Sequence, residues 1–407
     1  MEQQKLVFSE KPHKEDKAHQ KEKKILFLKD IVSIVTSKVS VDEVDIQNYI
    51  STENMIPNLG GIFESDSKPL KGNITAFKKN DILISNIRPY LKKIWYSDKN
   101  GGCSSDVLVL RTINEKIDQK YLFYILSSDK FFNYVMSTSK GTKMPRGDKK
   151  AILKFKVPIT YIENQKQYSN FLTIIDKKIE LLEKKYENKK LIKNYYLNKI
   201  LTEDFEKNKE WDFKPLNEIT FYQEGPGVRN YQYVHEGVKL LNVGNFVENQ
   251  LILENTDRYI SEEEAYGMYN HFLVDEGDLL IACSGIRAEY FDEKIAFAEK
   301  EHLPLCMNTS TMRFKSLDDN YLNLNYLKWY FQTKLFKKQI FRVLTGSAQF
   351  NFGPTHLKYL RIIVPSMDYQ IKISNFFDLI KEDLDCTKRQ IEEMKKFKKG
   401  LLQKMFV

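Results

Sequence analysis

The 407 residues exceed what one ordinary hydrophobic core organises and fit two domains with connecting elements. A hydrophobic fraction of 42%, with 26 Phe and 23 Tyr, excludes a chain that is disordered throughout. The formal charge of +9 favours an anionic partner, and the four scattered Cys and six His lack the spacing of disulfide frameworks or zinc sites, so we expect no metal.

The chain begins with a charged segment, residues 1–24, which lacks the apolar stretch of a signal peptide. No run approaches the 18 or so consecutive apolar residues that a membrane-spanning helix needs. We therefore expect a cytoplasmic protein with no membrane contact and a solvated N-terminal tail.

Two domains with mixed, mostly β-strand patterns follow, at residues 25–163 and 211–366. Runs such as DILIS, DVLVLR, DLLIA, TSTMRF and LRIIVP are short, apolar and bounded by Gly, Asn, Asp or Pro, which is typical of strands. Helical runs interrupt them, namely KYLFYILSSDKFFNYVMS in the first domain and NYLKWYFQTKLFKKQIFRVL in the second. The sequence predicts an α+β fold with two tandem β-rich domains.

The chain repeats itself once. The segment that begins at Gln165 aligns without a gap with the segment that begins at Gln370, at an offset of 205 residues. Upstream, NDILISNIR in the first half matches GDLLIACSGIR in the second. A repeat of this length fixes the architecture as an internal two-fold repeat, in which each half is a domain followed by a long helix.

The two helical segments, residues 164–205 and 369–407, carry apolar residues every 3.5 positions. Such heptads predict a coiled coil, and because neither helix can bury its stripe alone, we expect the two to pack against each other as long antiparallel helices that separate the domains. The alternative is that each helix packs separately on its own domain. The apolar or aromatic positions of the expected seam are Leu172, Ile175, Ile179, Leu182, Tyr186, Tyr196, Ile200, Phe377, Ile380, Leu384, Ile391, Met394, Leu401 and Met405.

Motifs of DNA-modifying enzymes are missing. The chain has neither the glycine-rich turn nor the polar-Pro-Pro-aromatic tetrapeptide of an adenine methyltransferase, and it has no GxxxxGK[ST] phosphate loop. Glu187 and Lys189 could be assigned to a nuclease site, but on a helical segment they favour a salt bridge. We expect no catalytic residues and no cofactor bound by this chain.

Polar loops occupy equivalent places in the two halves. Residues 85–93 match 283–291, residues 139–150 match 345–354, and residues 224–232 form a further Gly-Pro turn. Amide and guanidinium groups recognise base edges, lysines neutralise phosphates, and small residues permit close approach, so these loops indicate DNA contacts. The alternative is ordinary turns whose lysines face solvent. The candidate DNA-binding residues are Arg88, Lys92, Lys93, Lys140, Lys143, Arg146, Lys149, Arg229, Asn230, Arg287, Ser347, Gln349 and Asn351.

From about Lys24 to Val407 the chain resembles the specificity subunit of type I restriction-modification systems. The resemblance rests on two variable domains alternating with related helices, on the transitions VPITYIENQ and VPSMDYQ, on TGSAQFN, on the ending KKGLLQKMFV, and on NYISTENMIPNLGGI followed by NDILISNIRPYLKKIW.

This resemblance implies that each domain is a target-recognition domain for one half of a split double-stranded DNA site, while the helices set the number of unread bases between the halves. It also implies two methyltransferase subunits and restriction subunits as partners, and these would carry S-adenosylmethionine, ATP and Mg. The competing interpretations are a coiled-coil scaffold without DNA contacts, which would show no salt-dependent DNA binding, and a standalone DNA-modifying enzyme, which would act with only small cofactors added.

Overall fold

The computed structural model describes residues 24–200, 211–343 and 351–405, so the expected N-terminal tail lies outside the described residues. The chain forms two compact units. Unit 1 comprises Met1–Glu183 with Arg389–Val407, and unit 2 comprises Lys184–Lys388. Each unit thus takes in a part of both long helical segments, which the sequence-based division keeps apart from the domains.

Unit 1 is built on two sheets and a terminal strand pair. The central sheet has the antiparallel order β2-β9-β6-β7, and the second sheet has the order β3-β5-β8-β4, in which β4 and β8 run parallel. The strands are β1 (Lys24–Phe27), β2 (Val32–Ile34), β3 (Lys38–Ser40), β4 (Tyr49–Ile50), β5 (Asn73–Phe77), β6 (Ile82–Ser85), β7 (Ile94–Tyr96), β8 (Gly101–Cys103), β9 (Val107–Thr112) and β10 (Lys156–Ile159), with β1 paired to β10.

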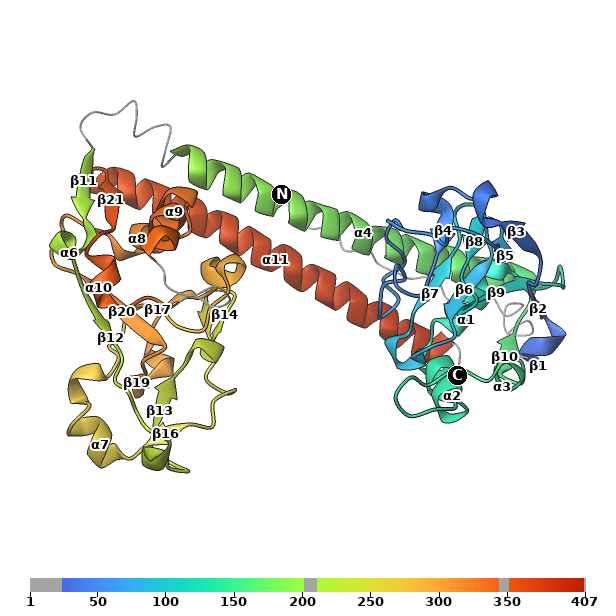
Figure 1. Ribbon diagram of the computed structural model, residues 1–407, viewed down its shortest axis with the longest axis horizontal. Coiled ribbons are helices and arrows are strands. Elements are labelled where there is room, and N and C mark those ends of the chain that lie inside the picture. The colour runs from blue at the N-terminus through green and yellow to red at the C-terminus, as the bar shows by residue number, and fades with distance from the viewer. Residues whose placement is uncertain (1–23, 201–210, 344–350, 406–407) are drawn as a thin grey trace, which may run out of the picture. The chain divides into compact units, whose positions relative to one another are not determined.

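Helices cover the central sheet of unit 1 (Figure 1). They are α1 (Gln119–Leu126), α2 (Asp129–Ser137) and α3 (Lys149–Ile152). Asp118 caps α1 by accepting from Tyr121 N at 2.7 Å, and Ser128 caps α2 by accepting from Phe131 N at 3.3 Å. The apolar faces of these helices and of the sheet form one core cluster, which also takes in Leu172 and Leu402 from the long helices.

Unit 2 is also built on a four-stranded central sheet with a second, smaller sheet. Its central sheet has the antiparallel order β12-β20-β17-β18, and a second sheet has the order β16-β13-β19, with β13 and β19 parallel. The strands are β11 (Asp212–Pro215), β12 (Thr220–Glu224), β13 (Val238–Leu241), β14 (Phe246–Val247), β15 (Gln250–Leu251), β16 (Tyr259–Ile260), β17 (Leu279–Ala282), β18 (Ile295–Phe297), β19 (Leu305–Met307), β20 (Thr311–Ser316) and β21 (Arg361–Val364). The helices are α6 (Leu216–Ile219), α7 (Glu262–Tyr266), α8 (Leu324–Phe331), α9 (Lys334–Val343) and α10 (Pro354–Leu357). The prediction of a mixed α+β fold is confirmed, and the expected strand runs lie on β6, β9, β17, β20 and β21.

The long helices are α4 (Ile162–Asn198) and α11 (Met367–Met405). Within unit 1, Asp176 pairs with Lys398 at 2.5 Å and Glu183 with Lys395 at 2.6 Å. Residues further along α4 therefore contact residues earlier in α11, so the two helical segments run in opposite directions.

The same opposite direction holds within unit 2. Lys189 pairs with Asp383 at 2.5 Å, and the Tyr196 ring lies 5.9 Å from that of Phe376. In each unit, the segments of α4 and α11 that belong to it pack side by side and run antiparallel.

The buried face of each long helix drifts away from the expected seam toward its C-terminal end. Near the start the seam positions Leu172, Ile175, Ile179, Leu182 and Phe377 are buried. Further along, Leu384 and Ile391 are buried and Tyr186, Ile200, Ile380, Met394, Leu401 and Met405 are partly buried.

At the far ends the buried positions are Leu197 and Leu402, one residue beyond the expected Tyr196 and Leu401, and Tyr196 is 40% exposed. Tyr196 nevertheless contacts Phe376 of α11, and Leu401 packs against the core cluster of unit 1, so only the position of greatest burial differs from the expected seam. An α-helix has 3.6 residues per turn, so a strict 3.5-residue stripe rotates by about 20° per heptad until a neighbouring residue faces the core.

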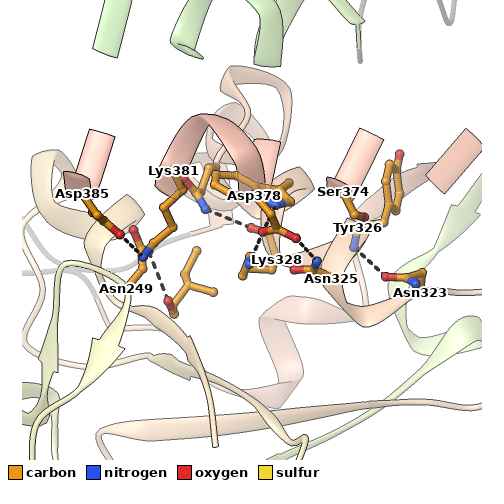
Figure 2. A network of polar contacts seen from close by, with 12 residues as sticks. Asn249, Asn323, Asn325, Tyr326, Lys328, Ser374, Asp378, Lys381 and Asp385 are labelled. Atoms are coloured by element: carbon orange, nitrogen blue, oxygen red, sulfur yellow. Dashed lines mark hydrogen bonds and ion pairs between the residues drawn. The ribbon is translucent and has the colours of Figure 1, made fainter. Parts of the chain in front are cut away.

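In unit 2, α8 is fixed to α11 through Asp378 (Figure 2). Lys328 Nζ and Trp329 Nε1 each donate to Asp378 Oδ1 at 3.0 Å, and Asn325 Nδ2 donates to Oδ2. Burial lowers the pKa of Lys328, while the hydrogen bond to Asp378 opposes that shift. This network holds the helical layer against the long helix while the loops at the edge of the sheet stay exposed.

Candidate nucleic-acid interface

Two of the candidate loops meet at one edge of the central sheet of unit 1. Loop 1A (residues 85–93) follows β6, and loop 1B (residues 139–150) follows α2. Gly147 N donates to Asn86 O at 2.9 Å and Arg88 N donates to Pro145 O at 2.8 Å. Loops 1A and 1B, each of which the repeat matched to a loop of the second half, are therefore linked by backbone hydrogen bonds into a single surface.

The corresponding loops of unit 2 also meet at the edge of its central sheet. Loop 2A (residues 283–291) follows β17, and of loop 2B (residues 345–354) the structure describes residues 351–354, so Ser347 and Gln349 lie outside the described residues. Phe352 N donates to Cys283 O at 2.9 Å. The Asn351 Oδ1 atom accepts from Ser284 Oγ at 2.7 Å and from Gly285 N at 2.9 Å. Asn351 therefore holds loops 2A and 2B together.

Loop 2C (residues 224–232) starts at the same edge, because β12 and β17 both run antiparallel to β20 and so end on the same side. Gly225 N donates to Thr311 O at 3.0 Å. A Cβ at Gly225 would lie 2.4 Å from Asn308 O, so only glycine allows this approach. Arg229 and Asn230, further along the loop, are exposed.

The basic side chains of unit 1 fall into two groups. Lys92 pairs with Asp129 at 2.5 Å, and Lys93 donates to Thr52 O at 2.6 Å, so both hold loop 1A in place. Burial, and secondarily the charge of Arg88, lowers the pKa of Lys93. These two lysines are already engaged within the protein.

The second group is exposed. Arg88, Lys143 and Lys149 are exposed and have no side-chain ion pair among the described residues, while Lys140 approaches Asp148 at 3.4 Å and is also exposed. Arg287 of loop 2A is likewise exposed. These side chains are free to contact an anionic ligand.

The backbone of loop 1A is strained on both sides of the short turn Pro89–Leu91. Arg88 and Lys92 adopt the left-handed region, with φ of 48° and 49°. For residues other than glycine this conformation costs on the order of 1–3 kcal/mol, and such strain is concentrated at functional sites. The hydrogen bond from Arg88 N to Pro145 O and the ion pair of Lys92 with Asp129 maintain it.

Three acidic or amide residues at these edges are not among the sequence-derived candidates. Asp106, just before β9, pairs with Arg146 at 2.9 Å. Asn86 is 7% exposed and its Oδ1 atom has no hydrogen-bond partner among the described residues. At Glu224, burial raises the pKa of the carboxyl, with His356 acting in the opposite direction. The only signal in the sequence was position, because Asn86 and Glu224 lie within candidate loops, whereas Asp106 precedes β9 and belongs to none of these loops.

A cavity of about 700 Å³ lies elsewhere in unit 2 and includes none of the loop residues. Its lysines are already bonded: Lys239 donates to Leu253 O at 3.2 Å and Lys381 pairs with Asp385 at 3.1 Å. Across the part of the chain that the structure describes, no group of His, Cys, Asp and Glu is arranged to hold a metal ion. No helix in those residues has the length and apolar character needed to cross a membrane.

The family described as "Type I restriction modification DNA specificity domain" matches residues 19–190 and 208–396. The chain therefore belongs to this family, as its resemblance indicated, and is a DNA-recognition subunit rather than an enzyme. The MjaVIII specificity subunit of Methanocaldococcus jannaschii is 23% identical over 368 residues, which cover 87% of this chain and 84% of that relative. The EcoDI specificity subunit of Escherichia coli is 26% identical over 129 residues, or 32% of this chain and 28% of that relative.

Two solved structures share the fold. The S subunit of a type I restriction-modification system from M. genitalium has a TM-score of 0.59 at 15% identity and covers 94% of this chain and 96% of that chain. A second structure comes from work on complex assembly and conformational transition of the type I R-M system. It has a TM-score of 0.61 at 16% identity and covers 94% of this chain and 96% of that chain.

Proposed function

We propose that the chain recognises a two-part double-stranded DNA site, with one part bound by each unit, within a type I restriction-modification complex. The observation that carries the proposal is that each unit has its own loop cluster at the same edge of an equivalent sheet. The backbone hydrogen bond from Gly147 to Asn86 in unit 1 has its counterpart in the bond from Phe352 to Cys283 in unit 2. Two equivalent clusters with different side chains suit two different half-sites.

The side chains of the clusters have the chemistry that DNA requires. Exposed Arg88, Lys143 and Lys149 in unit 1 supply the phosphate contacts that dominate affinity, while exposed Arg229 and Arg287 supply charge in unit 2. Amides and arginine forks at the same edges can reach base edges in the major groove.

The long helices serve this function as an antiparallel coiled coil within an internal two-fold repeat. We infer that they set the spacing between the half-sites and bind two methyltransferase subunits, to which restriction subunits are added. Large apolar side chains that the two helices leave exposed fit such docking, because exposed apolar surface marks interaction sites. On α4 these include Phe171, Ile174, Leu181, Leu191, Ile192 and Tyr195. S-adenosylmethionine, ATP and Mg belong to the partner subunits in this proposal, and action on the cell's own DNA gives the complex a cytoplasmic location.

The test is to produce the chain with its methyltransferase subunits and to sequence methylated adenines genome-wide, with and without the chain. We expect a split motif that disappears without the chain, and no methyl transfer by the purified chain alone with S-adenosylmethionine. Exchange of residues 211–366 for the equivalent domain of a relative should change one half of the motif only. Methyl transfer by the chain alone, or a change in both halves, would overturn the proposal, and the absence of salt-dependent DNA binding would indicate a scaffold.

A further inference from the structure

We propose that Arg146 recognises a guanine in the half-site of unit 1 and that Asp106 positions its guanidinium group for this contact. The inference rests on the proposed function and assigns a role within it. Of the two candidate arginines of loops 1A and 1B, Arg88 has no ion pair in the described structure, whereas Arg146 combines a fixed backbone, a carboxylate contact and an exposed remainder.

The backbone of Arg146 is held from both sides. Its N–H donates to Lys140 O and its carbonyl accepts from Lys140 N, both at 2.9 Å, and it also forms a β-bridge with Ile87. Its neighbours are tied to loop 1A, because Pro145 O accepts from Arg88 N. The Cα atom of Arg146 is therefore fixed relative to the edge of the sheet.

The side chain is held at one point. Arg146 Nη1 lies 2.9 Å from Asp106 Oδ1, and Asp106 is itself anchored because its carbonyl accepts from Asn86 N at 2.8 Å. The Arg146 side chain is still 52% exposed. One nitrogen is thus restrained by the protein while the rest of the guanidinium fork remains accessible to a ligand.

The carboxylate decides which ligand fits. A phosphate that approached Arg146 would also meet the negative charge of Asp106, and that repulsion weakens the contact. The neutral edge of guanine offers the acceptors O6 and N7, which a guanidinium fork matches with two hydrogen bonds. Because Asp106 already restrains the side chain, less conformational entropy is lost on binding.

Lys143 provides the contrast on the same loop. It is exposed and has no ion pair among the described residues, which suits a phosphate contact that carries no sequence information. Arg146→Ala and Lys143→Ala therefore form a matched pair for the experiment. Arg146→Lys keeps the charge but loses the fork, and Asp106→Asn removes the charge that restrains Arg146.

The experiment measures DNA binding by the complex with its methyltransferase subunits, using the mapped site and variants with single substitutions in the half-site of unit 1. For Arg146→Ala and Arg146→Lys we expect discrimination at one G·C pair to fall by about 5- to 150-fold, as for loss of a bidentate contact. Asp106→Asn should reduce discrimination at the same pair by a smaller factor. Lys143→Ala should weaken all sequences equally and reduce the salt dependence.

The outcomes separate the two proposals. Arg146 variants that keep full discrimination, or that weaken all sequences equally as Lys143→Ala does, would overturn the guanine contact while leaving the proposed function intact. A wild-type complex that methylates no split motif would overturn both. If Arg146→Ala fails to fold, Arg146→Lys decides the question, because it retains the ion pair with Asp106.

Discussion

Gln165 and Gln370 make the same hydrogen bonds at the starts of the two long helices. Each side chain is fully buried, each Oε1 atom accepts from a backbone N–H at 2.9 Å, and each Nε2 atom donates to two carbonyls. The donors and acceptors are Asp118 N, Lys116 O and Thr160 O in unit 1, and Asn323 N, Tyr321 O and Pro365 O in unit 2. One glutamine thus joins the helical layer, the strand end and the long helix in each unit.

Replacement of this glutamine should destabilise its unit. Gln165→Leu leaves one buried N–H and two carbonyls without partners, and each such group costs about 1–3 kcal/mol. We expect a lower Tm and faster hydrogen exchange at the Asp118 amide, with little change in unit 2. Gln167→Leu, at an exposed position of the same helix, is the control, and equal effects of the two substitutions would contradict this account.

Asp129 should contribute stability only above acidic pH. Lys92, and to a smaller degree Lys399, holds the pKa of Asp129 below its usual value of 3.8. A lowered pKa in the folded state stabilises the protein above the pKa of the unfolded chain, and this contribution is lost as the pH falls through the folded value. Asp129→Asn should therefore lower the Tm at pH 7, by the equivalent of up to about 1 kcal/mol, and this loss should shrink as the pH falls below 3.8.

The measurement is the Tm of the wild type and of Asp129→Asn across this pH range, and the control is Asp45→Asn at an exposed position. A loss of Tm that was equally large at both ends of the range would contradict the ion pair. Because Lys92 is engaged by Asp129, Lys92→Ala should lower the Tm more than it lowers DNA affinity, whereas Lys143→Ala should do the reverse.

Glu224 should show the opposite dependence on pH. Burial raises the pKa of its carboxyl above the usual 4.5, so the folded state favours the protonated form. That contribution to stability is present below the ordinary pKa and is lost as the pH rises through the folded value. Glu224→Gln, which stays neutral, should raise the Tm at pH 8, and the gain should shrink as the pH approaches 4.

The exposed Glu236→Gln is the matched control for this series, because it removes the same charge without burial. The measurement is again thermal unfolding at several pH values. A Tm difference for Glu224→Gln that does not change with pH would show that burial of this carboxyl has no energetic consequence.

The length of the long helices should set the gap between the half-sites. Four residues inserted into each helix where the units divide, after Glu183 in α4 and after Lys388 in α11, add about 6 Å of helix at about 1.5 Å per residue. Since DNA rises about 3.4 Å per base pair, we expect the gap to grow by about one to two unread base pairs while the recognised bases stay the same. Methylation motifs are mapped for the wild type, for this variant and for a control with four residues inserted after Asp66 in an exposed loop. If the helix variant is active and its gap is unchanged, helix length does not set the spacing between the half-sites.

Sequence pattern predicted those features that depend on periodicity and repetition. Short apolar runs identified the strands, and the repeat identified which loops correspond, because equivalent segments fold alike. The pattern did not predict that burial near the ends of the long helices is greatest at Leu197 and Leu402 rather than at Tyr196 and Leu401, because this depends on the 3.6-residue turn.

Charge pattern did not distinguish basic residues that are free from those that are bonded within the protein. Lys92 and Lys143 look alike in the sequence, yet Lys92 pairs with Asp129 whereas Lys143 is exposed. Asp106 and Arg146 lie in separate segments of the chain, so the spacing of residues in the sequence does not predict that they form an ion pair. Such contacts arise from the tertiary fold alone.

The composition of unit 1 has a consequence for how the chain matures. Its core cluster includes Leu172 and, from near the C-terminal end, Leu402, although the whole of unit 2 lies between them in the chain. Domains generally fold as they emerge during synthesis, N-terminal parts first. Here unit 1 would be completed only after unit 2 has emerged, since its segment Arg389–Val407 follows unit 2 in the chain. A ribosome that stopped near residue 388 would release a chain with its second recognition unit whole and an uncovered apolar surface on its first.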